Sequence, residues 1–163
     1  MKPWNKAILY PCIKGVSILL LLVFIIHLSY GGRISKADFT AVSEAVVAAS
    51  EDLGSMKEAD VQMIKRLYNL TPSDYEGVLL YYPTTNMGAE EIFLIKLKDV
   101  SQSAVVQEAI QNRTAAQMAS FDGYGLTQYA MLENSVTFVE GNYILYVVSP
   151  DPEPVRKAFL NAI

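Results

Sequence analysis

Arg113 and Gln117 are the residues whose types and spacing most suggest a chemical role. The sequence predicts a long helix over residues 101–121, closed by Asp122-Gly123. At ~100° per residue, Arg113 falls in the middle of the apolar or small-residue face of this helix. That face is formed by Val105, Ala109, Ala116 and Ser120. Because an unpaired buried charge is very costly, the guanidinium must be paired or reach a wet cleft. Gln117 lies one turn on and can share that cleft, and Glu133 or Glu91 can supply a carboxylate.

Two interpretations of Arg113 stay open at this point. In the first, a small polar pocket binds a small anionic ligand or a peptide C-terminus through the guanidinium. The candidate ligand-binding residues are then Arg113, Gln117, Tyr124 and Glu133. Tyr124, in the segment FDGY, offers an aromatic contact edge suited to peptide or glycan contacts. In the second, Arg113 forms a structural ion pair, or its stem covers the core while its head reaches water.

The composition argues against most enzymes. One Cys and one His exclude a disulfide framework, an internal Cys-cluster zinc site, a Ser-His-Asp triad and paired-His metal motifs. The acidic clusters lack the EF-hand spacing, and no P-loop or G-x-G-x-x-G is present. We therefore expect a protein that is not an enzyme and has no cofactor or metal. A carboxylate-dependent envelope hydrolase is a weaker alternative, which needs two of Glu90, Glu91, Glu133 and Asp122 to face one cleft.

Charge is distributed unevenly along the chain. Residues 1–36 carry five basic residues and no acidic one, whereas residues 37–163 carry all 17 acidic residues against eight basic ones, a net charge of −9. Such an acidic region repels phosphate backbones and anionic lipid headgroups. Nucleic acid is therefore excluded as an expected partner.

The N-terminal segment predicts membrane attachment. Between Lys14 and Arg33 lie 18 uncharged residues, GVSILLLLVFIIHLSYGG. A helix of that length spans roughly 27 Å, near the thickness of the bilayer hydrocarbon core. We predict a basic cytoplasmic flank over residues 1–14, a transmembrane anchor or uncleaved signal over 15–32, and a short linker over 33–37. The basic flank indicates a cytoplasmic N-terminus and an extracellular C-terminal domain in a single-pass cell-membrane protein. A cleaved signal peptide is the alternative, although Ser-Tyr-Gly over residues 29–31 is a poor cleavage site.

Residues 38–163 are predicted to form one extracytoplasmic α+β domain. Two helices are expected, one beginning at Asp38 and one opening near Ser55, where Glu58 three residues on completes a capping box. Strands are expected over residues 77–82, 91–98, 135–140 and 143–149, with a hairpin turn at Gly141-Asn142 and a last helix after Asp151. This ββα-ββα order predicts a four-stranded, mostly antiparallel sheet packed by helices. Strands 77–82 and 143–149 are apolar on both faces, so the helix pair over residues 38–69 is expected to provide a second cover.

Several segments of the domain resemble domain of unknown function 4358. They are YNLTPSDYEGVLLYYPTTNMGAEEIFLIKLKD, AIQNRTAAQ, the F-x-x-Y of Phe121 and Tyr124, LEN at residues 132–134 and GNY at 141–143. The resemblance spans residues 38–163. It implies an uncharacterised bacterial family, found chiefly in Firmicutes, of small proteins with an N-terminal anchor or lipoprotein signal and one extracytoplasmic domain. Cys12 precedes the apolar run, so no lipoprotein cysteine is present and the resemblance implies a transmembrane anchor here. The family brings no known catalytic residues or ligand.

These observations predict a membrane-tethered extracytoplasmic module that binds a protein or a cell-envelope component. The membrane is contacted through residues 15–32, and the partner is an envelope protein or the cell wall. A binding domain for a small anionic or peptide ligand around Arg113 is the alternative.

Overall fold

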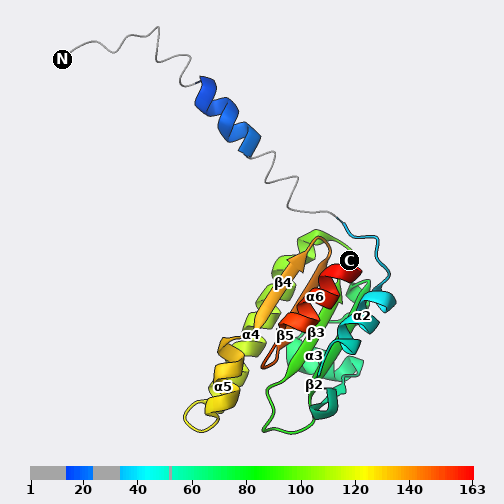
Figure 1. Cartoon of the computed structure of the whole chain (residues 1–163), viewed down its shortest axis with the longest axis vertical. Coiled ribbons are helices and arrows are strands. Elements are labelled where there is room, and N and C mark those ends of the chain that lie inside the picture. Colours follow the sequence, from blue (N-terminus) through cyan, green and yellow to red (C-terminus); the bar gives the residue numbers. More distant parts are fainter. Residues whose placement is uncertain (1–13, 24–33, 52) are drawn as a thin grey trace, which may run out of the picture. The chain divides into compact units, whose positions relative to one another are not determined.

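The computed structural model describes residues 14–23, 34–51 and 53–163. They fall into two units, Met1–Arg33 and Ile34–Ile163. In the first unit, residues 14–23 form a helix with exposed side chains (Figure 1). The rest of the predicted anchor over residues 15–32, and nearly all of the basic flank over 1–14, lie outside the described residues. None of the helices in the described ranges is both long enough and apolar enough to cross a membrane.

The second unit, Ile34–Ile163, is the folded domain. Its α-helices are α2 (Phe39–Ala48), α3 (Val61–Tyr68), α4 (Ser103–Phe121), α5 (Leu126–Glu133) and α6 (Glu153–Ala162). Its strands are β1 (Met56–Glu58), β2 (Gly77–Pro83), β3 (Glu91–Lys96), β4 (Val136–Glu140) and β5 (Tyr143–Val148). Short 3-10 turns occupy Leu53–Ser55, Pro72–Asp74 and Val100–Gln102.

The sheet has five strands in the order β1-β2-β3-β5-β4, and all neighbouring strands are antiparallel. The mixed α and β class and the four predicted strands are confirmed, but the expected total of four strands is wrong. The missing strand is β1, in which Met56 pairs with Pro83 and Glu58 with Tyr81. The predicted helix does not open near Ser55; α3 begins after Asp60, whose carboxylate accepts a hydrogen bond from the backbone N–H of Met63. A strand of three residues is too short to show an alternating pattern, so the sequence does not predict β1. The capping-box pattern of Ser55 and Glu58 is a strong local signal, and it placed the start of the helix too early.

Two predicted turns are confirmed, and both depend on glycine. β4 and β5 pair around Gly141-Asn142, and Gly141 has φ +60°. A glycine with positive φ at the first central position is typical of a two-residue II′ hairpin. Gly123, with φ +80°, follows the C-terminal end of α4, where a left-handed residue commonly ends a helix.

Helices cover both faces of the sheet (Figure 1). α2 and α6 pack on one face, and α3, α4 and α5 pack on the other. The central strands β3 and β5 are therefore buried along their whole length. Of the two strands predicted to be covered on both faces, β5 is fully buried, whereas β2 is only partly buried. The helix pair expected over residues 38–69 is, however, divided between the two faces. The helices that follow β3 and β5, α4 and α6, also lie on opposite faces of the sheet.

The segment that leads into α2 is part of the domain. The backbone N–H of Ser35 donates to Asn142 Oδ1 at 2.9 Å, and the Tyr143 hydroxyl donates to the carbonyl oxygen of Ala37 at 2.9 Å. The predicted linker over residues 33–37 therefore overlaps the folded unit, which begins at Ile34. The chain enters the domain beside the β4–β5 hairpin.

A buried cation holds this entry segment. Lys96 Nζ donates to the carbonyl oxygen of Ala37 at 2.9 Å and forms an ion pair with Glu76 at 2.6 Å. Burial by itself lowers the pKa of Lys96, but Glu76 and Tyr143 outweigh it and raise that pKa above its usual value. The ammonium group therefore stays charged and bound at neutral pH.

Candidate functional site

Arg113 forms an ion pair with Glu91. Arg113 Nη2 donates to Glu91 Oε2 at 2.7 Å, and Nε lies 3.2 Å from the same oxygen and 3.3 Å from Oε1. The Glu91 side chain is fully buried on β3, and the Arg113 side chain is 16% exposed on α4. Of the two carboxylates that the sequence offered, Glu91 and not Glu133 makes the ion pair.

Tyr68 is the second side chain that donates a hydrogen bond to the Glu91 carboxylate. Its hydroxyl, at the C-terminal end of α3, donates to Glu91 Oε1. Its ring stacks on Phe93 with the centroids 4.1 Å apart. Burial, followed by the negative charge of Glu91, raises the pKa of Tyr68 well above its usual value, so the hydroxyl remains a proton donor. Both Glu91 oxygens are thus satisfied by side chains from two helices.

Thr114, the residue after Arg113, forms a second polar contact between α4 and the sheet. Thr114 Oγ1 donates to the carbonyl oxygen of Ile110 at 2.9 Å and lies 2.8 Å from the Tyr146 hydroxyl. A hydroxyl has a single proton to donate, so Tyr146 is the donor to Thr114. Burial raises the pKa of Tyr146 despite this bond. α4 is therefore joined by hydrogen bonds to both central strands, β3 and β5.

Gln117 is buried one turn after Arg113, but it does not join this network. Its side chain is on a residue only 6% exposed, and its Oε1 accepts no hydrogen bond from any described residue. An unsatisfied buried acceptor costs about 1–3 kcal/mol of stability.

Replacing Gln117 by methionine is therefore expected to raise the free energy of unfolding by about 1 kcal/mol, because the unsatisfied acceptor is removed at similar volume. Chemical denaturation of the full chain in detergent micelles, followed by far-ultraviolet circular dichroism, measures this change. Gln111→Met, at an exposed position of the same helix, is the matched control and should change stability by less than about 0.5 kcal/mol. A loss of stability in Gln117→Met would contradict the prediction and show that Oε1 is satisfied in solution.

The buried face of α4 differs from the predicted one. It consists of Val106, Ala109, Ile110, Gln117 and Phe121, whereas Val105, Ala116 and Ser120 are exposed. The true face is thus rotated by roughly one residue, or ~100°. At ~100° per residue, Arg113 falls inside this buried face, between Ala109 and Val106, which agrees with a side chain that is only 16% exposed and needs a partner for its charge.

The two other predicted ligand residues lie elsewhere. Tyr124 follows the end of α4, and the eight residues of helix from Arg113 to Phe121 measure about 12 Å. Glu133 is exposed at the C-terminal end of α5. Of the four predicted site residues, only Arg113 and Gln117 lie close together, one turn apart on α4.

The chemistry of this cluster is that of a closed polar network. Arg113 and Glu91 neutralise each other, and Glu91 is inaccessible to a substrate. Within the described ranges, no group of three His, Cys, Asp or Glu residues is placed to hold a metal ion. The geometry therefore favours the structural ion pair over a pocket for an anion, and it offers no support for a pair of catalytic carboxylates.

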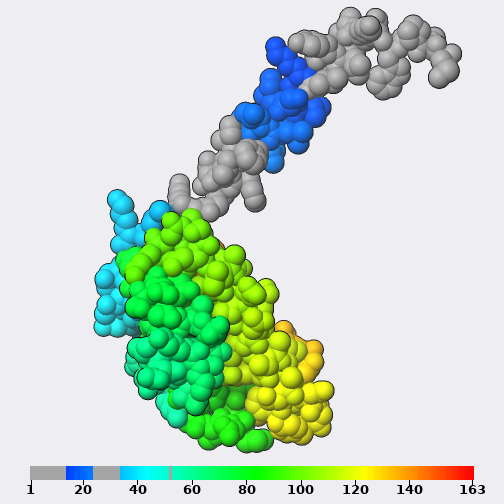
Figure 2. Space-filling view, turned by 180° about the vertical axis from the view of Figure 1, so that it is seen from behind, coloured from blue at the N-terminus to red at the C-terminus, as the bar shows by residue number. Residues whose placement is uncertain are grey.

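A different part of the domain has exposed apolar side chains. Met87 in the β2–β3 loop is 59% exposed, and Tyr124 and Leu126 at the α4–α5 turn are 65% and 79% exposed. We call these three residues the distal patch. Gln128 Nε2 donates to the carbonyl oxygen of Met87 at 3.0 Å and so joins the loop to α5. Figure 2 shows the loop and the turn side by side at one end of the domain. Sequence reasoning identified Tyr124 only, because single apolar residues in loops have no periodicity.

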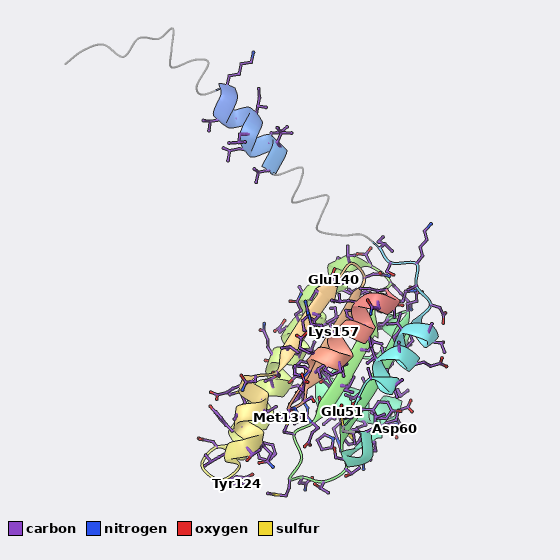
Figure 3. The ribbon with its side chains drawn as sticks, in the orientation of Figure 1. Glu51, Asp60, Tyr124, Met131, Glu140 and Lys157 are labelled. Atoms are coloured by element: carbon purple, nitrogen blue, oxygen red, sulfur yellow. The ribbon has the colours of Figure 1, made fainter. Side chains whose placement is uncertain are left out.

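The distal patch lies at the opposite end of the domain from the chain entry. Figure 3 labels Tyr124 at one end and Glu140, beside the hairpin turn, at the other. Ser35 is hydrogen-bonded to Asn142 in that same turn. The chain thus enters the domain at one end, and the distal patch lies at the other.

A family model described as a domain of unknown function, DUF4358, matches residues 49–149. The chain belongs to the DUF4358 family. The matched region of DUF4358 runs from before β1 to the end of β5, so it contains the ion pair, the polar network and the distal patch. α2 and α6, which cover the second face of the sheet, lie outside it. No curated protein matches the chain, and no solved structure does.

Proposed function

We propose that this member of the DUF4358 family is a membrane-tethered extracytoplasmic module that binds a protein partner through the distal patch. One observation supports this above all. Three apolar side chains that are each more than half exposed, Met87, Tyr124 and Leu126, lie on two segments that are hydrogen-bonded together, at the end opposite the chain entry.

The exposure of these side chains is unfavourable without a partner. Single exposed apolar residues are common on protein surfaces, but grouped ones on loops typically mark interaction sites. Met87, Tyr124 and Leu126 are each more than half exposed. Tyrosine and methionine are both enriched in protein interfaces, and tyrosine is common among the residues that contribute most of the binding energy.

The location of the patch agrees with a tether at the N-terminus. The charge and hydropathy of residues 1–36 predict an anchor over residues 15–32 and an extracellular domain. A domain held at Ile34 keeps its entry end near the attachment point and leaves its other end free to meet a partner.

Site-specific photo-crosslinking tests the proposed binding. A photoreactive amino acid is placed at Leu126 in the full chain, in intact cells of the producing organism. Val105, which is 55% exposed on α4 outside the patch, is the matched control. We expect a discrete protein adduct from position 126 and none from position 105. An equal yield at both positions, or no adduct at 126, would overturn the proposal.

A separate measurement tests the compartment. A cysteine added after Ile163 should react with a membrane-impermeant maleimide in intact cells, with Cys12 replaced by serine to remove the other thiol. Labelling only after the membrane is permeabilised would contradict an extracytoplasmic domain.

A further inference from the structure

The charged residues of the two segments that carry the distal patch are all acidic. Residues 84–90 and 114–135 contain Glu90, Asp122 and Glu133 and no lysine or arginine. Asp122 is exposed two residues before Tyr124, and Glu90 is partly exposed three residues after Met87. The two segments that carry the apolar side chains thus contribute negative charge only.

This charge limits the kinds of partner. Anionic lipid headgroups and anionic wall polymers are repelled, because like charges placed together at an interface are costly. A second copy of the chain is disfavoured too, since a twofold contact through the patch brings Asp122 close to its own symmetry mate. A basic surface gains from the same charges.

The apolar residues add a second requirement. Met87 and Leu126 offer no hydrogen-bonding groups to a sugar, so they gain most from burying an apolar side chain. We infer that the distal patch binds a protein segment in which an apolar or aromatic side chain is flanked by lysine or arginine. This inference rests on the proposed function and specifies its partner.

The turn that presents Tyr124 is well defined. The Phe121 ring is buried and lies 6.2 Å from the Tyr124 ring, centroid to centroid. A Cβ on Gly125 would collide with that Phe121 ring, and Gly123 has φ +80°. The backbone N–H groups of Tyr124 and Gly125 donate to the carbonyl oxygen of Phe121 at 3.3 and 3.0 Å, so a hydrogen-bonded turn presents Tyr124 at the surface.

The sequence of the cross-linked partner tests the inference. Mass spectrometry of the adduct from position 126 identifies the peptide that contacts the patch. We expect a segment with net positive charge and an apolar or aromatic residue at the cross-link. An adduct to an acidic or uncharged segment, to lipid or to a second copy of the chain would overturn the inference. Loss of the adduct altogether would instead overturn the proposed function.

Charge reversal gives an independent measurement. Asp122→Lys should lower the adduct yield by about two- to fivefold, as expected for one exposed charge pair. Lysine at the C-terminal end of α4 is favourable for the helix, so the loss would not reflect unfolding. Glu108→Lys, at an exposed position near the other end of α4, is the matched control and should leave the yield unchanged. An undiminished yield in Asp122→Lys would contradict a basic partner.

Discussion

Replacing Arg113 by methionine should lower the free energy of unfolding by about 3–5 kcal/mol, because it leaves the buried carboxylate of Glu91 without its positive partner. Methionine retains most of the apolar stem of arginine, so the loss reports mainly on the charge. Urea titration of the full chain in detergent micelles, followed by far-ultraviolet circular dichroism, measures the change.

The double variant distinguishes the effect of an unpaired charge on stability from the effect of lost packing. Arg113→Met/Glu91→Met should recover most of the lost stability, since paired apolar side chains commonly replace a buried ion pair at little cost. Lys65→Met, at an exposed position of α3, should change stability by less than about 0.5 kcal/mol. A loss below about 1 kcal/mol in Arg113→Met would show that water hydrates the Glu91 carboxylate in that variant. A double variant as unstable as the single one would show that the loss does not come from an unpaired carboxylate.

Alkaline pH should destabilise the domain steeply. Burial raises the pKa of Tyr68 and of Tyr146 above their usual value. The folded state therefore holds these two protons more tightly than the unfolded state does. Their contribution to stability is complete below about pH 10 and is lost as the pH rises through the folded pKa values. Each of these two tyrosines should lower the free energy of unfolding by up to about 1.4 kcal/mol per pH unit once the pH is above about 10, and Tyr75, Tyr81 and Tyr143, whose pKa values burial also raises, add to the fall.

Denaturant titrations at pH values from 9 to 12 measure this slope, and absorbance at 295 nm reports tyrosine ionisation in the same samples. Tyr68→Phe should reduce the slope by up to about 1.4 kcal/mol per pH unit, because the proton of Tyr68 is gone. Tyr124→Phe is the matched control, since the Tyr124 side chain is exposed in the folded domain. Ionisation of all tyrosines without any loss of structure would contradict the prediction.

The ion pair and the distal patch are parts of one element. α4 carries Arg113 at its middle and ends at Phe121, directly before the turn that presents Tyr124. Arg113 and Thr114 join this helix to β3 and β5. The polar network therefore fixes the helix on which part of the proposed binding surface is built, and a variant that breaks it should also weaken binding at the patch.

The sequence by itself determined the elements whose signals are local. An alternating run predicts β3, a run that is apolar on both faces predicts β5, Gly141-Asn142 predicts the hairpin, and Gly123 predicts the end of α4. These features depend on residues only a few positions apart, so the backbone conformation follows from neighbouring side chains. The family resemblance is likewise carried by the sequence, and the family match confirms it.

Only the tertiary structure decided which distant residues meet. Glu91 is 22 residues from Arg113 and 23 from Tyr68, and the Met87 carbonyl is 41 residues from Gln128. The three-residue strand β1 also exists only because β2 lies beside it. Such contacts follow from how helices and strands pack on the sheet, and periodicity along the chain does not encode that packing. For this reason the sequence located the charge of Arg113, whereas the fold supplied its partner and brought the distal patch together.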